Sequence, residues 1–158
     1  MRVILPGSYD PVTLGHLDLI RRAREAYDEV YAVIFINPEK KYMFSPEQRV
    51  EMLRLATEGM SGVTVDFSDG LVIDYMKKNG IEKIIKGIRN DVDLEWERVQ
   101  AEYNFSHGGF VTELYKAGDG LSALSSTLAR EHILESDSLV EILPKPVIEY
   151  LKDKNIKN

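Results

Sequence analysis

The chain has 158 residues, 44% hydrophobic and 29% charged, a composition typical of one globular domain spanning residues 1–158. It contains no cysteine, which excludes disulfides, thiolate metal ligands and cysteine nucleophiles. The net charge of −6 argues against a nucleic-acid-binding protein, because such proteins need a basic face. No segment approaches the ~20 apolar residues of a membrane span, and no basic leader opens the chain, so we expect a cytoplasmic protein with no membrane contact.

Short apolar runs alternate with amphipathic stretches along the whole chain. Their periodicity predicts strands over residues 3–5, 30–36, 63–67, 83–86 and 110–115. It predicts helices over residues 16–27, 45–58, 71–79, 91–104, 126–132 and 146–154. Ser45 and Gln48 have the spacing of a capping box, and Gly59 and Gly80 suit helix C-caps. On the helix over 91–104, we interpret one apolar stripe as the buried face: Val92, Trp96, Val99 and Tyr103.

Strand and helix alternate five times, which predicts an α/β fold with a Rossmann-like five-stranded parallel sheet and helices on both faces. In such sheets, ligands bind beyond the carboxyl ends of the strands, close to the point where the strand order reverses. The residues that follow each strand are therefore the candidates for a functional site.

The first strand is followed by Gly-Ser-Tyr-Asp-Pro over residues 7–11 and by Gly-His over residues 15–16. Gly7 lets a ligand approach the backbone, and Ser8 supplies a hydroxyl. His16 stands at the start of a helix, where an imidazole can donate to a phosphate oxygen. For His16 alone, a helix-capping role is an equally good interpretation.

This string resembles the signature of the nucleotidyltransferase superfamily, usually Gly-Thr-Phe-Asp-Pro…Gly-His. Here Ser8 replaces the threonine and Tyr9 replaces the phenylalanine, which keeps the hydroxyl and the ring. The resemblance implies transfer of a nucleotidyl group, with His16 at the α-phosphate. The motif alone does not separate the branches of the superfamily.

The fourth strand leads into Lys86-Gly87-Ile88-Arg89 and then a helix that carries Glu97. Arg89 can hold phosphate with two parallel hydrogen bonds, and Glu97 can accept from a ribose hydroxyl. The block is similar to the Arg-Gly-Leu-Arg segment of the phosphopantetheine adenylyltransferase family. Lys86 stands where that family usually has arginine, so the charge is kept and the planar fork is lost.

Three further segments resemble the same family. Lys40, after the second strand, matches a lysine that contacts the phosphate of phosphopantetheine. Leu71 and Val72, after the third strand, match residues that line the pantetheine arm, although on periodicity alone such residues are more often plain core residues. Residues 124–130, where the helix over 126–132 begins, are similar to the family's Ile-Ser-Ser-Ser/Thr-x-x-Arg phosphate motif, but residues 116–123 before them depart from the family pattern.

The resemblance implies that ATP and 4′-phosphopantetheine give dephospho-CoA and pyrophosphate in coenzyme A biosynthesis. It implies Mg²⁺ carried by ATP rather than a metal site in the protein, binding of dephospho-CoA or CoA, and a homohexamer. We predict that His16 is catalytic. The predicted ATP-binding residues are Ser8, Tyr9, His16, Gly87, Ile88, Arg89, Glu97, Leu121, Ser122, Ala123, Leu124, Ser125, Ser126 and Thr127. The predicted acceptor-binding residues are Ser8, Lys40, Leu71, Val72, Lys86 and Asn104.

Two other functions stay open on the sequence. One is a related nucleotidyltransferase that uses nicotinamide mononucleotide or CTP. The other is a nucleotide-binding module of similar architecture that binds ATP without turnover and does not need His16.

Overall fold

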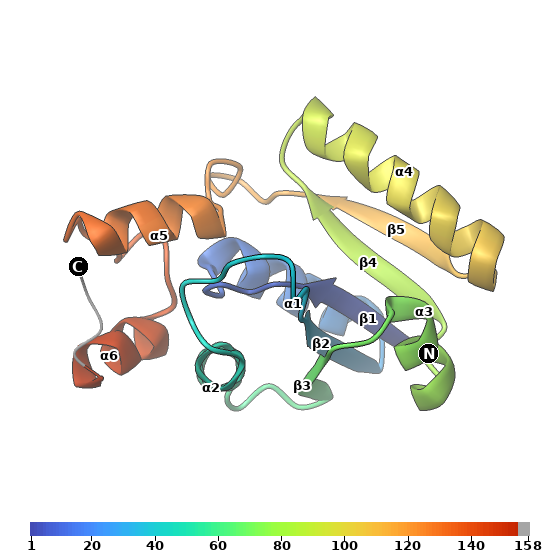
Figure 1. Ribbon diagram of the computed structural model, residues 1–158, viewed down its shortest axis with the longest axis horizontal. Helices are drawn as coiled ribbons and strands as arrows, with labels where there is room; N and C mark the ends of the chain where they lie inside the picture. The colour runs from blue at the N-terminus through green and yellow to red at the C-terminus, as the bar shows by residue number, and fades with distance from the viewer. Residues whose placement is uncertain (155–158) are drawn as a thin grey trace.

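The computed structural model describes residues 1–154 and contains a five-stranded parallel sheet with the strand order β3-β2-β1-β4-β5 (Figure 1). The strands are β1 (Arg2–Gly7), β2 (Glu29–Phe35), β3 (Val63–Ser68), β4 (Lys83–Ile88) and β5 (Val111–Lys116). The helices are α1 (Leu14–Ala26), α2 (Pro46–Ala56), α3 (Val72–Asn79), α4 (Asp91–Gly108), α5 (Ser126–Leu134) and α6 (Lys145–Asp153). The predicted Rossmann-like α/β class is confirmed.

The strand order reverses between β1 and β4, and the sheet opens there. β1 pairs with β2 along its whole length, from Arg2 to Gly7. It pairs with β4 only at Val3 and Ile4, which lie opposite Lys83 and Ile84. Beyond these pairs the two strands separate, so their carboxyl ends leave a gap at the switch point. This is where a doubly wound sheet binds its ligand.

The sheet is buried on both faces, which explains the continuous apolar run of β1. Val3 and Leu5 join the larger core cluster, together with Ile20 of α1 and Leu53 of α2. Ile4 points the other way, into a smaller cluster with Met76 of α3. Consecutive side chains of a strand alternate between faces, so a strand covered on both sides needs apolar residues at every position.

The helix termini follow the local signals in most places. Ser45 and Gln48 form the predicted capping box of α2, with Pro46 at its first position. Gly80 closes α3 in the left-handed conformation, with φ of 64°. However, α2 ends at Ala56 rather than near residue 58, and α1 begins two residues earlier than predicted, because Thr13 is its N-cap.

The predicted buried face of α4 is wrong. Val92, Trp96, Val99 and Tyr103 are 78%, 62%, 60% and 52% exposed, whereas Glu97 is the buried residue of this helix. The polar side of α4 turns toward β4 and β5, and the apolar stripe points outward. Periodicity identifies residues that share a helix face, but it does not say which face turns toward the sheet.

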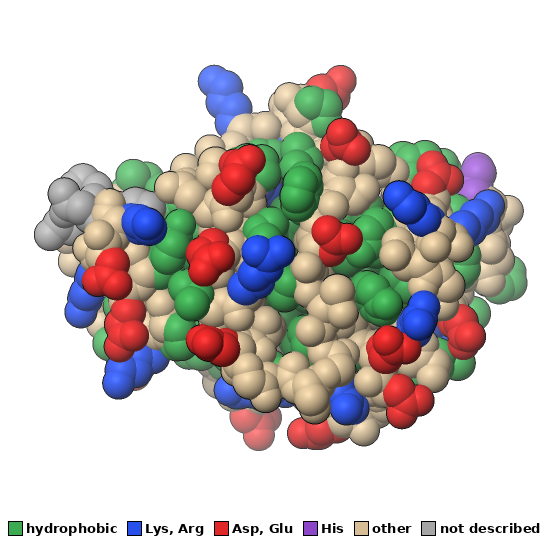
Figure 2. All heavy atoms as spheres, turned by 90° about the horizontal axis from the view of Figure 1, so that it is seen from below, with side chains coloured by type: hydrophobic (Ala, Val, Ile, Leu, Met, Phe, Trp, Pro, Cys, Tyr) green, Lys and Arg blue, Asp and Glu red, His purple; other side chains and the backbone are tan. Residues whose placement is uncertain are grey.

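The helices within residues 1–154 are all too short or too polar to cross a membrane. On the side of the molecule drawn in Figure 2, acidic and basic side chains are interspersed rather than gathered by sign.

Candidate functional site

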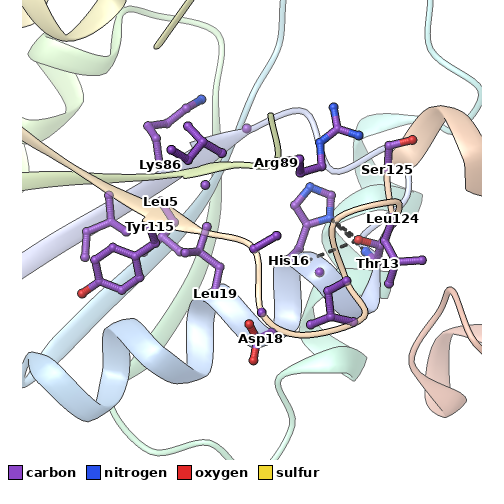
Figure 3. Close-up of a pocket in the computed structure, with 18 of the residues that line it drawn as sticks. Leu5, Thr13, His16, Asp18, Leu19, Lys86, Arg89, Tyr115, Leu124 and Ser125 are labelled. Atoms are coloured by element: carbon purple, nitrogen blue, oxygen red, sulfur yellow. Dashed lines mark hydrogen bonds between the residues drawn. The ribbon is translucent and has the colours of Figure 1, made fainter. Parts of the chain in front are cut away.

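Two cavities lie at the gap between β1 and β4. The larger, of about 250 Å³, is bounded by β1, β4, α1, the end of β5 and the loop before α5 (Figure 3). The smaller, of about 200 Å³, lies between the same two strands, β5 and the polar face of α4. Pro6, Gly7 and Lys86 line both cavities. The switch point therefore holds two adjoining spaces, and Lys86 stands where they meet.

Most of the residues predicted to bind ATP line the larger cavity. These are Tyr9, His16, Gly87, Ile88, Arg89, Leu121, Leu124, Ser125 and Ser126. Ser8 and Glu97 line the smaller cavity instead, and Ser122, Ala123 and Thr127 line neither. A contact between Glu97 and the ribose would thus require the nucleotide to reach from one cavity into the other.

The residues predicted to bind the acceptor divide in the same way. Ser8, Val72, Lys86 and Asn104 come together around the smaller cavity. Lys40 and Leu71 line neither cavity. Leu71 is 64% exposed, so the alternative that it is a core residue is wrong, whereas Val72 both lines the cavity and packs on the smaller core cluster.

The His16 side chain has a defined orientation and tautomer. The backbone N–H of Thr13 donates to His16 Nδ1 at 2.9 Å, as part of the capping box that starts α1. Because Nδ1 is the acceptor, the ring proton is on Nε2. The Tyr9 ring packs against the imidazole with centroids 4.9 Å apart, and its hydroxyl donates to the Leu5 carbonyl. The helix cap thus leaves Nε2–H as the group available to a ligand in the cavity.

The imidazole is neutral near pH 7. Burial lowers the pKa of His16 to about 4, and the positive charges of Lys86 and Arg89 add to this effect. A neutral ring donates one hydrogen bond without bringing a full charge into the cavity. The helix-cap interpretation of His16 and its position in the cavity are both correct, because Nδ1 serves the cap and Nε2 stays free.

We expect the His16 imidazole of the ligand-free protein to stay neutral down to about pH 5, as followed by NMR of the ring protons. Its folded pKa of about 4 lies below the unfolded value of 6.5, so the unfolded chain binds the extra proton first. The contribution of His16 to stability is therefore complete above pH 6.5 and declines as the pH falls from 6.5 to about 4. Titration near 6.5 in the folded protein would contradict this assignment.

Lys86 of β4 and Arg89, between β4 and α4, form a cationic side of the larger cavity. Arg89 is held by Asp93, whose carboxylate accepts from both the Arg89 backbone and Nε at 3.1 Å. Across the cavity, Ser125 caps α5 by accepting from the Leu128 N–H, and the Ser126 hydroxyl donates to the Pro11 carbonyl. The start of α5 is thus fixed against the loop after β1, and a helix start favours anions.

The smaller cavity combines one cation with two buried oxygens. Lys86 Nζ lies 3.5 Å from Glu97 Oε2, which is an electrostatic contact rather than a good hydrogen bond. Glu97 Oε2 and Thr112 Oγ1 are buried without a hydrogen-bond partner among residues 1–154. Burial raises the pKa of Glu97, and the charge of Lys86 opposes that rise. These groups are poised for a ligand that brings both negative charge and hydrogen-bond donors.

A family model described as cytidylyltransferase-like matches residues 4–132 of the 158. The chain belongs to the cytidylyltransferase-like family. Every residue that lines either cavity falls within the matched segment. Membership in this family indicates a nucleotidyltransferase, which agrees with the resemblance of the His16 motif.

In this cytidylyltransferase-like protein, buried charges hold the loops around the site, and the sequence motifs gave them no role. The Asp10 carboxylate accepts from the N–H groups of Met43 and Phe44, which fixes the loop after β2. Arg49, 1% exposed, donates from Nη1 to the Ser8 carbonyl. Asp10 belongs to the first motif, so its polarity was visible in the sequence, but its partners lie more than 30 residues away.

Proposed function

We propose that the protein transfers the adenylyl group of ATP to 4′-phosphopantetheine, giving dephospho-CoA and pyrophosphate. One observation carries the proposal: Lys86 lines both cavities, so a single cation can reach the nucleotide and the acceptor. The larger cavity suits the nucleotide, because apolar walls lie beside the cationic side formed by Arg89. The smaller suits the phosphate and amide-bearing arm of the acceptor.

The reaction we propose is an in-line displacement. An acceptor phosphate oxygen attacks the α-phosphorus, a new P–O bond forms, and the bond from the α-phosphorus to the pyrophosphate oxygen breaks. A phosphate oxygen is already anionic at neutral pH, so no general base is needed, and positioning and charge stabilisation supply the catalysis. His16 donates Nε2–H to the α-phosphate, Lys86 orients the acceptor, and Arg89 holds the leaving pyrophosphate.

Mg²⁺ enters this proposal as part of the substrate MgATP. Within residues 1–154, no three His, Asp or Glu side chains gather in a way that would hold a metal ion. The phosphates of ATP and water are the ligands that Mg²⁺ usually keeps in such sites.

The proposal is tested by measuring pyrophosphate release from ATP, CTP and GTP with phosphopantetheine, nicotinamide mononucleotide and glycerol 3-phosphate as acceptors. We expect turnover with ATP and phosphopantetheine, and dephospho-CoA as the product by mass spectrometry. Preference for CTP or for another acceptor would replace this proposal with a different nucleotidyl transfer. ATP binding without release of pyrophosphate from any pair would contradict enzymatic function.

We also propose that copies of this chain assemble, as the homohexamer that the resemblance implies, with the outward stripe of α4 in the contact. Trp96 and Val99 lie near the middle of this stripe, and both are more than half exposed. A helix with its polar face inward and its apolar face outward is the reverse of a solvent-facing helix. Exposed apolar surface of this kind supports an association site.

Replacing Val99 by glutamate is expected to lower the mass of the assembly, measured by size-exclusion chromatography with light scattering. The fold should persist, because Val99 is 60% exposed in the single chain. Val140→Glu is the matched control, since Val140 is 72% exposed but lies between α5 and α6. A wild-type monomer, or a Val99→Glu protein of unchanged mass, would refute the α4 contact.

A further inference from the structure

One carboxylate in the larger cavity has no part in the proposed reaction. Asp18 lies on α1, two residues after His16, and its side chain is 33% exposed. In Figure 3, Lys86 and Arg89 lie on one side of His16 and Asp18 lies on the other. Arg22, the ion-pair partner of Asp18, lines the cavity beside it.

Arg22 holds the Asp18 carboxylate in place. Arg22 Nη1 donates to Asp18 Oδ2 at 3.4 Å and to the Lys116 carbonyl at 2.7 Å. The Arg22 guanidinium also lies 5.0 Å from the centre of the Tyr115 ring. The end of β5 thus holds Arg22, and Arg22 holds Asp18. A hydrogen bond of 3.4 Å is long, so the carboxylate keeps most of its capacity to accept another.

The loop after β5 passes directly against the same carboxylate. A Cβ added at Gly118 would stand 2.9 Å from Asp18 Oδ2, closer than real side chains come. Glycine at this position therefore lets the loop backbone approach while Asp18 keeps its orientation.

The walls beside Asp18 are apolar and include Leu19, Leu121 and Leu124. A Cβ added at Gly87 would lie 3.2 Å from Leu19 Cδ2. Because Gly87 has no side chain, Leu19 can pack close to the backbone of β4. Apolar walls with one acceptor at the edge match a planar base that carries a hydrogen-bond donor on its rim. Lys86 and Arg89, on the other side of His16, would attract the triphosphate, whereas Asp18 is paired with Arg22, and this difference sets the direction of the nucleotide.

We propose that Asp18 accepts a hydrogen bond from the exocyclic amine of the nucleotide base and so selects amino-bearing bases over keto-bearing ones. Adenine presents an N–H donor at this position, whereas hypoxanthine presents a carbonyl oxygen that the carboxylate repels. Asp18 is then a specificity-determining residue of the nucleotide site, and Arg22 and Gly118 are positioning residues. The inference rests on the proposed function at one point: it requires that the nucleotide base occupies the larger cavity.

The test compares equilibrium binding of MgATP and MgITP by calorimetry, which needs no acceptor. We expect the wild-type protein to prefer ATP, and Asp18→Asn to lower the ratio of the two affinities on the order of 10-fold, because an asparagine amide can donate to a keto oxygen. Asp28→Asn is the matched control, since Asp28 lies just beyond α1 with a 90% exposed side chain; it should leave the ratio unchanged.

A second variant leaves Asp18 itself in place. Gly118→Ala would push the carboxylate aside, so we expect weaker ATP binding and a lower ATP-to-ITP ratio. Asp18→Asn and Gly118→Ala proteins that both keep the wild-type ratio would overturn the proposal, even if their overall affinity falls. Failure of the proposed function shows separately, as base-selective binding without pyrophosphate release in the presence of phosphopantetheine.

Discussion

Replacing His16 by alanine is expected to lower kcat by about 10²-fold or more at saturating substrates, with a smaller change in the KM for ATP. The lost group is the Nε2–H of a neutral imidazole, fixed because Nδ1 accepts from the Thr13 N–H. In an in-line displacement, negative charge builds up on the α-phosphate oxygens in the transition state. A donor preorganised for that charge acts mainly on kcat, because the ground state gains less from it.

His16→Ala also removes part of the capping box of α1, so the control variant must remove the equivalent part of another capping box. Gln48 occupies the position in α2 that His16 occupies in α1, and its Oε1 accepts from the Ser45 N–H at 3.0 Å. Gln48→Ala should therefore destabilise the protein by a similar amount, about 1 kcal/mol, without touching either cavity. Normal kcat in Gln48→Ala and reduced kcat in His16→Ala would separate chemistry from stability. Near-normal kcat in His16→Ala would refute the role of the imidazole.

Local sequence signals predicted the architecture and much of the larger cavity. The motif after β1 is short, and its glycine and histidine act through local backbone geometry: Thr13 and His16 form a capping box three residues apart. Alternating strands and helices determine a parallel sheet, and its switch point follows from topology. Residues placed by these rules, such as Arg89 and Ser125, do line the same cavity.

The sequence did not predict features that depend on distant partners. The apolar periodicity of α4 predicts Trp96 on its inner face, but the structure turns Glu97 inward, because a cavity rather than a packed core lies beneath that helix. Ser8 and Glu97 line a different cavity from most of the other residues predicted to bind ATP. This difference arises because β1 and β4 separate beyond Ile4. Strand divergence leaves no periodic signal in a single chain.

Replacing Lys86 by methionine is expected to reduce kcat/KM for the acceptor by about 10²-fold or more, because it removes the cation that both cavities share. Lys86→Arg should keep most of the activity, since it keeps the charge and supplies the guanidinium that the phosphopantetheine adenylyltransferase family usually has here. Steady-state kinetics with varied phosphopantetheine measures both. Equal activity of the two variants would contradict the proposed role.

Lys86→Met also leaves Glu97 buried without its counterion, so stability must be separated from catalysis. We expect a loss of about 2 kcal/mol, less than for a fully buried pair, because the Lys86 side chain is 27% exposed. Without Lys86, the pKa of Glu97 rises further above its ordinary 4.5. The folded state then holds the proton more tightly than the unfolded state, so stability falls as the pH rises above 4.5. Urea unfolding should show a larger deficit at pH 8 than at pH 5.

The double variant Lys86→Met/Glu97→Gln decides between the two effects. Removing both charges should recover most of the lost stability and abolish its extra pH dependence, because no uncompensated carboxylate remains. It should not recover kcat/KM, because the acceptor phosphate still lacks its cation. Recovery of activity together with stability would mean that Lys86 acts only as the counterion of Glu97, and the junction of the two cavities would then need another group to align the acceptor with the α-phosphate.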